Sequence, residues 1–175
     1  MLQSTDANRK LWALVAQQLQ AAGANGVMFK TPASFGPSQA NRQAMRRFFD
    51  ETVRPSTDAQ IIWEPRGIWE YEDAIELATE LGIVLAVDPF TDAAFPEPLP
   101  QNAYYILTGP HGQARFREDD LARLIEFVDE HDGSVTLSVR GAYRERVARR
   151  VLELLQTDTG YEDDAVELAD PDASA

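Results

Sequence analysis

Five short apolar segments of this sequence each end in a polar side chain. The five side chains are Lys30, Glu64, Asp88, Thr108 and Arg140. Carboxylates near a lysine and an arginine suit two kinds of chemistry: proton transfer by the carboxylates, and binding of a phosphate or carboxylate group by the cations. If the protein is an enzyme, we expect the catalytic residues to be Glu64, Asp88 and Lys30, with Glu64 or Asp88 as the base.

Residues close to these segment ends are candidates for ligand binding. Phe35 lies in the loop after Lys30, where it would form a lid or floor, and Trp69 could stack on a ligand, although a buried core tryptophan is the commoner role. A purely structural alternative stays open, in which the cations pair with the two carboxylates only to neutralise the rim. The predicted ligand-binding residues are Arg66, Trp69, Thr108, Arg140 and Phe35.

Familiar nucleotide, zinc and nucleophile motifs do not occur in the sequence. It has no P-loop and no GxGxxG, and Ser34 and Ser38 do not stand in a nucleophile elbow. His111 and His131 lack zinc-type spacing. Glu64, Asp88 and His111 could together hold a cation, but three ligands on separate loops are a weak signal for a metal site. We assign no metal ligand, leave the cofactor unknown, and expect His131 to be a surface residue at a helix end.

The elements that position these residues follow from the spacing of apolar side chains. Apolar residues recur with a helical period over about residues 6–22, and Ser38 can cap a second helix. Strands are predicted at 27–30, 61–64, 83–87, 104–108 and 135–139, with helices after four of them and a proline-rich loop over 91–102. This alternation predicts an α/β fold, a parallel sheet covered by helices.

Side chains alternate between the two faces of a strand, so each strand can be divided by parity. One parity is bulky and apolar throughout, as in Phe29 and Trp63, and is expected to pack against helices. The other parity is mixed and turns polar at the carboxyl end of every strand, where ligands bind in parallel α/β proteins. We therefore expect the tips of Lys30, Glu64, Arg66, Asp88 and Arg140 to line one cleft.

Composition limits the class of protein. The chain has 175 residues, 44% of them hydrophobic, no cysteine and a net charge of −13. The charge disfavours nucleic acid and anionic membranes as partners, and the start of the sequence lacks a signal-peptide core, so we expect a cytoplasmic protein. Residues 1–156 are expected to form one domain, and the acidic residues 157–175 a disordered tail.

The sequence resembles the YecE-like family, also called domain of unknown function 72. The resemblance runs from about Gly26 to Leu155. It is carried by the segments Phe29-Lys30-Thr31-Pro32-Ala33-Ser34-Phe35, Glu64-Pro65-Arg66-Gly67-Ile68-Trp69 and Val87-Asp88-Pro89-Phe90, with Asn41 and Phe48 between them. It implies a TIM barrel. The biochemical activity of the family is not established.

Two departures from the family pattern affect the expected fold and site. The chain resembles the last five-eighths of a barrel, so we expect a partial TIM-barrel-like sheet of five strands, and a truncated gene model is one explanation. Ile106 and Thr108 stand where the family has arginine and histidine, and Arg140-Gly141 where it has an asparagine pair. Among the polar site positions of the family, those of Lys30, Glu64, Arg66 and Asp88 remain.

The leading interpretation is an uncharacterised YecE-like protein that binds or processes a small anionic ligand, phosphorylated or sugar-like, at the carboxyl strand ends. The alternative is a non-catalytic domain that acts through protein–protein association. Open sheet edges would expose the inner face, so we expect a homodimer or a partner chain that completes the barrel, with the first helix covering part of the gap. The residues expected to meet water are Met28, Ile62, Val84, Tyr104 and Ile106.

Overall fold

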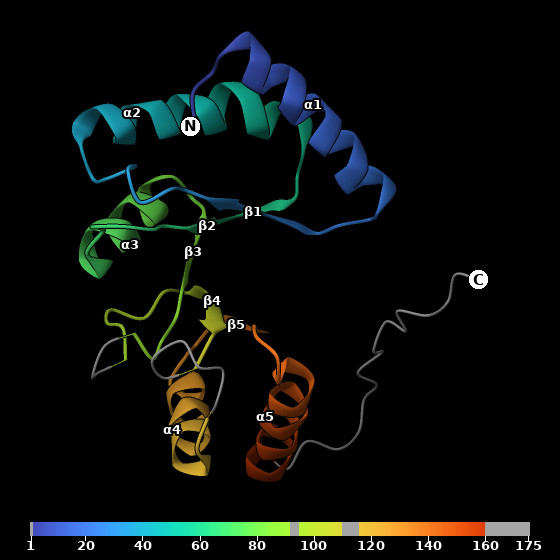
Figure 1. Cartoon of the computed structure of the whole chain (residues 1–175), viewed down its shortest axis with the longest axis vertical. Helices are drawn as coiled ribbons and strands as arrows, with labels where there is room; N and C mark the ends of the chain where they lie inside the picture. The colour runs from blue at the N-terminus through green and yellow to red at the C-terminus, as the bar shows by residue number, and fades with distance from the viewer. Residues whose placement is uncertain (1, 92–94, 110–115, 160–175) are drawn as a thin grey trace.

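The computed structural model describes residues 2–91, 95–109 and 116–159, the last three by backbone only. Within these residues helices and strands alternate along the chain, apart from one pair of consecutive strands (Figure 1). In chain order they are α1 (Asp6–Ala21), β1 (Gly26–Lys30), α2 (Gln39–Phe48), the short helical turns η1 (Phe49–Val53) and η2 (Arg54–Ser56), β2 (Gln60–Glu64), α3 (Tyr71–Glu80), β3 (Val84–Val87), β4 (Asn102–Leu107), α4 (Glu118–Asp129), β5 (Ser134–Val139) and α5 (Arg144–Thr159).

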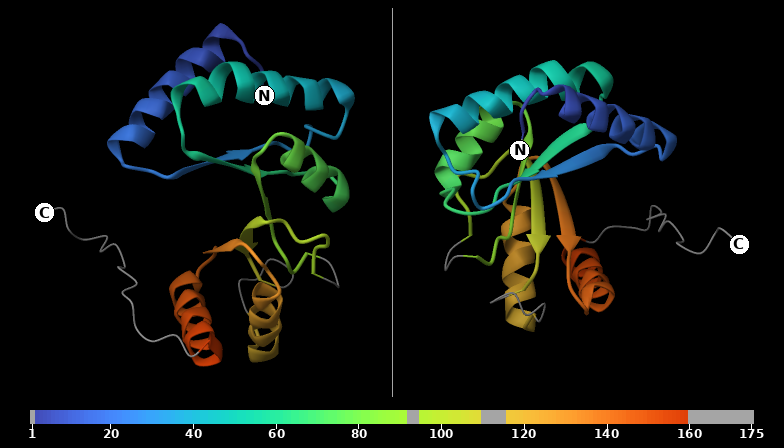
Figure 2. Two further views of the ribbon diagram at one scale, coloured as in Figure 1. Left: turned by 180° about the vertical axis from the view of Figure 1, so that it is seen from behind. Right: turned by 45° about the horizontal axis from the view of Figure 1, so that its top comes forward.

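The five strands form one parallel sheet in the order β1-β2-β3-β4-β5. The sheet turns strongly along this order, and the helices lie outside the turn, with α1, α2 and α3 around one half and α4 and α5 around the other (Figures 1 and 2). Sequential parallel strands joined by outer helices are the arrangement of a (β/α) barrel. The predicted α/β fold, a partial TIM-barrel-like sheet of five strands, is confirmed.

Local sequence signals set the element ends. Thr5 and Ser38 accept hydrogen bonds from the backbone N–H groups of Asn8 and Asn41, which caps α1 and α2. The sequence predicts a proline-rich loop over 91–102, and the described residues between β3 and β4 contain no helix. Helix α5 ends at Thr159, and the rest of the predicted acidic tail lies outside the described residues. Within those residues, none of the helices combines the length and apolarity that a membrane crossing requires.

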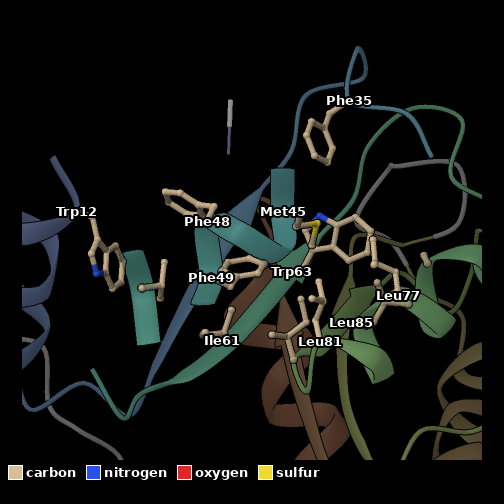
Figure 3. Close-up of a cluster of buried hydrophobic side chains, with 14 residues drawn as sticks. Trp12, Phe35, Met45, Phe48, Phe49, Ile61, Trp63, Leu77, Leu81 and Leu85 are labelled. Atoms are coloured by element: carbon tan, nitrogen blue, oxygen red, sulfur yellow. The ribbon is translucent and has the colours of Figure 1, made fainter. Parts of the chain in front are cut away.

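The helix side of the sheet holds two apolar cores. The first packs β1, β2 and β3 against α1, α2 and α3, and is rich in aromatic rings (Figure 3). Phe29 contacts the rings of Trp12, Phe48 and Phe49 at centroid distances of 5.5, 5.9 and 5.3 Å. The second core packs β4 and β5 against α4 and α5 around Tyr105. The apolar parity of the strands faces the helices, as the sequence predicts.

The inner face of the sheet forms a third, smaller cluster, and here one expectation is wrong. Ile62, Val84 and Ile106 are only 7, 9 and 3% exposed, because the curvature of the sheet packs them against one another. Met28 and Tyr104 are half-buried at the margin of this cluster. The inner face therefore does not meet water to the extent that a flat five-stranded sheet would require.

Helix α1 does not cover the inner face, contrary to expectation. Trp12 and Val15 pack into the helix-side core, and the indole of Trp12 donates a hydrogen bond to Ser56 Oγ at 2.6 Å. The helix therefore lies outside the sheet, where a crossover helix belongs. Leu11 and Leu14 remain 62 and 59% exposed on its surface.

Candidate functional site

The five polar residues singled out in the sequence stand at the carboxyl end of the sheet. Lys30 and Glu64 are the last residues of β1 and β2 and are paired in the strand register. Asp88, Thr108 and Arg140 immediately follow β3, β4 and β5. Their parity is that of the inner face, and parallel strands end on the same side of the sheet. The five residues therefore share one rim.

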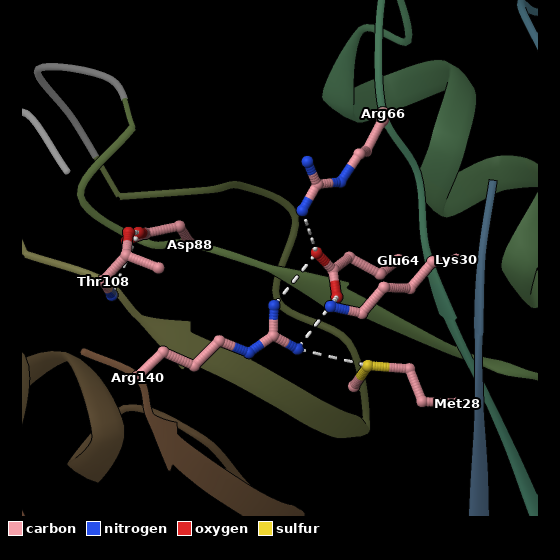
Figure 4. Close-up of polar contacts among 7 residues, drawn as sticks. All are labelled: Met28, Lys30, Glu64, Arg66, Asp88, Thr108 and Arg140. Atoms are coloured by element: carbon pink, nitrogen blue, oxygen red, sulfur yellow. Dashed lines mark hydrogen bonds and ion pairs between the residues drawn. The ribbon is translucent and has the colours of Figure 1, made fainter. Parts of the chain in front are cut away.

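Three cations surround Glu64 (Figure 4). Arg140 reaches across from the end of β5 and donates to both carboxylate oxygens, at 3.0 and 2.8 Å. Lys30 Nζ lies 3.0 Å from Glu64 Oε2, and Arg66 Nη2 lies 3.5 Å from Oε1. A bidentate arginine with a second cation on the same oxygen is a strong arrangement for a carboxylate. This group of four residues is called the Glu64 cluster below.

Burial and pairing act on the pKa of Glu64 in opposite directions. Burial alone would raise the pKa of this carboxyl, but hydrogen bonds from Arg140 and Lys30 and the charges of both outweigh it, so the pKa lies below its usual 4.5. The hydrogen bonds from Arg140 to Glu64 raise the pKa of Arg140. Glu64 is consequently a carboxylate at neutral pH, whereas a general base works best with a pKa near the operating pH.

Asp88 has a different set of partners. Its Oδ1 accepts the backbone N–H of Phe90 at 3.0 Å, and its Oδ2 accepts the backbone N–H of Thr108 at 3.2 Å and the Thr108 hydroxyl. Figure 4 shows Asp88 and Thr108 directed toward each other and away from the Glu64 cluster. Asp88 thus fastens the end of β3 to the end of β4 through neutral donors.

A cleft of about 850 Å³ opens beside these groups. The predicted residues Glu64, Arg66, Trp69, Asp88, Thr108 and Arg140 all line it. Lys30 does not line this cleft. It reaches the site through its ion pair with Glu64, and it is among the residues that line a second cavity between β1 and α1. The prediction that five charged tips share a cleft therefore holds for four of them.

The two predicted aromatic residues have different positions. Phe35 is 1% exposed, packs in the helix-side core and lines the second cavity, not the cleft, so it does not form a lid over the cleft. Trp69 is half-buried and packs edge-on against Trp63 at 4.9 Å. Its indole donates to the Phe35 carbonyl at 2.5 Å, so Trp69 is both a packing residue and part of the cleft wall.

The loops that carry Arg66 and Phe35 are packed closely together. Gly67 has a φ of +92°, and a Cβ at this position would lie 2.4 Å from the Ala33 carbonyl oxygen. Only glycine tolerates this backbone conformation and this approach at once. The contact holds Arg66 beside the end of β1, where its guanidinium can reach Glu64.

Tyr71 is a wall residue that sequence reasoning missed. Its hydroxyl donates to the Pro98 carbonyl at 2.9 Å, which links the start of α3 to the loop before β4. Burial, and secondarily the charge of Glu72, raise the pKa of Tyr71 to about 12. Its place in the sequence, seven residues after Glu64, is the available signal, because loops after parallel strands form the walls of such sites.

One of the two histidines differs from the sequence expectation, and the other lies outside the described residues. His131 is half-buried between the Tyr105 hydroxyl at 2.8 Å and the Phe127 carbonyl at 3.0 Å, so its assignment to the surface is wrong. Because the Phe127 carbonyl can only accept a hydrogen bond, Nδ1 of His131 carries a proton. In the neutral imidazole, Nε2 then accepts from the Tyr105 hydroxyl. His111 lies outside the described residues, which contain no cluster of three potential metal ligands.

Comparisons with known proteins support the fold. A DUF72 family protein from Enterococcus faecalis V583 superposes with a TM-score of 0.60 at 13% identity, over 92% of this chain and 68% of that one. A xylose isomerase domain containing protein from Salmonella typhimurium LT2 gives a TM-score of 0.60 at 18% identity, over 89% and 72%. The chain thus has a DUF72-like fold. No family model and no curated protein matches the sequence.

Proposed function

We propose that this TIM-barrel-like protein binds a small anionic ligand, phosphorylated or sugar-like, in the cleft at the carboxyl ends of its strands. The observation that carries the proposal is the excess positive charge of the Glu64 cluster. Three cations surround a single carboxylate, which leaves a net charge of +2. An added anionic group would balance this charge without disturbing the pair between Glu64 and Arg140.

The accessibility of the cations supports the same proposal. The side chains of Arg66 and Lys30 are 61 and 46% exposed, whereas that of Glu64 is only 11% exposed. The carboxylate is therefore enclosed, and the cations face outward. Arginine presents paired N–H donors that match the oxygens of a phosphate or carboxylate, so Arg66 is the residue best suited to make first contact with such a ligand.

The outer part of the cleft restricts the charge of the ligand. Glu70, Glu72 and Glu97 also line the cleft, and all three are exposed. Their carboxylates would repel a ligand that carries several negative charges. A ligand with one anionic group and an uncharged, hydroxyl-rich remainder fits the cleft better, because carboxylates accept hydrogen bonds from hydroxyls.

The partners of the carboxylates favour binding over proton transfer by Glu64. Its lowered pKa makes it a poor base at neutral pH. Asp88 already accepts three hydrogen bonds, which leaves little free capacity on its two oxygens. Both residues therefore hold the cleft in shape, and Lys30, Arg66 and Arg140 supply the attraction for an anion.

Calorimetric titration tests this proposal. We expect inorganic phosphate and glucose 6-phosphate to bind at low salt, and glucose to bind far more weakly. Arg66→Ala should lower the affinity for both phosphates about tenfold, since the loss of one charge-assisted hydrogen bond is worth about 1.5 kcal/mol. Arg150→Ala is the matched control, because Arg150 is also a partly exposed, carboxylate-paired arginine but lies on α5. Equal binding by both variants, or no binding of either phosphate, would contradict the proposal.

A second candidate function, association without catalysis, is favoured by one observation. Among the described strands, β1 and β5 each have a single neighbour, so two strand edges are open. Open edges are ready sites for pairing with another chain. We propose this role as the alternative, with oligomeric state as its test.

A further inference from the structure

The open edge of β1 presents a defined set of backbone groups. Asn25 O accepts from Gln60 N at 2.8 Å, and Thr31 N donates to Glu64 O at 3.2 Å, so the odd-numbered residues direct their backbone groups toward β2. Backbone groups alternate in direction along a strand. The N–H and C=O groups of Gly26, Met28 and Lys30 therefore point to the open edge, where no described strand pairs with them.

An apolar cavity adjoins this edge. It has a volume of about 350 Å³, lies between β1 and α1, and is lined by apolar residues that include Leu11, Trp12, Val27 and Phe29. Leu11 and Leu14 are more than half exposed on α1. Residues three apart share a helix face, so these two leucines form an apolar surface on α1, and Leu11 also lines the cavity beside the strand edge.

We propose that a second copy of this chain pairs with β1 in antiparallel fashion, about a two-fold axis that passes midway between the Met28 residues of the two copies. This inference does not depend on the proposed ligand. The symmetry places Met28 opposite Met28 of the second copy, and Lys30 opposite Gly26 of the second copy. Each outward-pointing residue then faces an outward-pointing residue, which is the hydrogen-bonded pairing of an antiparallel ladder.

The side chains suit this register. Val27 of one copy lies opposite Phe29 of the other, and both belong to the helix side of the sheet. An apolar pair of this kind stabilises a ladder by about 0.2–1 kcal/mol. Lys30 faces a glycine and meets no like charge across the ladder. The axis also places both α1 helices on one side, where Leu11 and Leu14 of the two copies can pack together.

The edge of β5 is less suited to the same role. Ser134 and Thr136 are exposed there, and Ser134 Oγ donates to Asn102 at 2.7 Å within the chain. The centre of β1, by contrast, consists of Val27, Met28 and Phe29. Exposure of the apolar β1 edge to water costs more free energy than exposure of the polar β5 edge. A two-fold dimer also requires a self-complementary patch, which the β1 edge provides.

Sedimentation equilibrium at micromolar concentration tests the proposal. The wild type should be a dimer, and the association should strengthen with salt, because a net charge of −13 repels a second copy and salt screens the repulsion. Leu11→Glu combined with Leu14→Glu should give a monomer with an unchanged circular dichroism spectrum. Leu152→Glu, at an exposed leucine of α5, is the control and should leave the dimer intact.

Hydrogen exchange provides a readout specific to the strand edge. In the wild type the amides of Met28 and Lys30 should be protected, and in the Leu11→Glu, Leu14→Glu variant they should exchange rapidly while Phe29 stays protected by β2. A monomeric wild type, a double variant that still dimerises, or fast exchange at Met28 in both proteins would overturn the proposal. Open-ended oligomers would also overturn it and would indicate pairing of β1 with β5 of another copy or with a strand of another protein.

Discussion

Glu64 and Asp88 end neighbouring strands and line the same cleft, yet their carboxylates have opposite kinds of partner. Glu64 is surrounded by three cations, at 2.8 to 3.5 Å. Asp88 accepts hydrogen bonds only from backbone N–H groups and one hydroxyl among the described residues. The first arrangement collects excess positive charge and can attract a ligand, whereas the second connects two strands. Residue type and strand position alone therefore do not assign a role to a rim carboxylate.

Neutralising Glu64 should have the largest effect on stability. Glu64→Gln leaves Arg140 and Lys30 partly buried without an anion, and we expect a loss of about 2–4 kcal/mol, slightly below the usual range for a broken buried pair because the cations reach solvent. Urea denaturation measures this loss. Glu118→Gln removes an exposed partner of Arg150 and should cost far less stability than Glu64→Gln, because solvent screens an exposed ion pair. Equal losses in the two variants would show that the Glu64 cluster is an ordinary surface network.

Asp88→Asn should have a smaller effect of a different kind. The amide keeps one acceptor oxygen but places an N–H₂ group against donors at Thr108 or Phe90. We expect a loss of about 1–2 kcal/mol in urea denaturation. Phosphate affinity should stay the same or rise slightly, because Asp88 does not contact the cations and the change removes one negative charge from the cleft lining. A large drop in phosphate affinity with normal stability would mean that Asp88 belongs to the ligand site.

The stabilisation from Glu64 should depend on pH. Its pKa is lowered in the folded protein, so its contribution is fully present above the ordinary value of 4.5 and is lost as the pH falls through the lower folded value. The difference in unfolding free energy between wild type and Glu64→Gln should therefore be constant from pH 5 to 7 and should shrink below pH 4.5. If the difference in unfolding free energy grows as the pH falls, Glu64 does not stabilise the folded protein as a carboxylate.

Arg66→Ala should have the smallest effect on stability. The guanidinium is 61% exposed, and its contact with Glu64 is the longest of the cluster at 3.5 Å. We expect a change below about 1 kcal/mol in urea denaturation, although the same variant should lose phosphate affinity. A destabilisation as large as that of Glu64→Gln would place Arg66 in the structural part of the cluster.

Parity and strand order predicted the face and the end of the sheet at which the site lies. Lys30 and Glu64 could be placed together because both end a strand and share the inner parity. The alternation also predicted the parallel sheet and its helix-side core, since one parity of every strand, which includes Trp63, is bulky and apolar throughout. These inferences succeed because the pleat has a fixed period of two.

Other features depend on distances that no local pattern encodes. Arg140 crosses the concave face to contact Glu64 and lies 3.3 Å from the Met28 sulfur, so the two halves of the curved sheet are connected at the rim. The strength of the curvature, and with it the burial of Ile106, follows from packing among many side chains. The direction of Phe35 could not be predicted because a loop aromatic can point to the cleft or to the core, and only the packed structure distinguishes the two.

Chemical rescue tests the central claim, that the Glu64 cluster is a site for an anionic group. In Glu64→Gln the cluster has lost its only carboxylate, so inorganic phosphate should take its place between Arg140 and Lys30. Thermal unfolding with and without phosphate measures the effect, with chloride at equal ionic strength as the control. The account predicts a larger rise in Tm with phosphate for Glu64→Gln than for the wild type, and no such gain when Arg140→Ala is added. Equal rises in all three proteins would show that phosphate acts non-specifically and would contradict the claim.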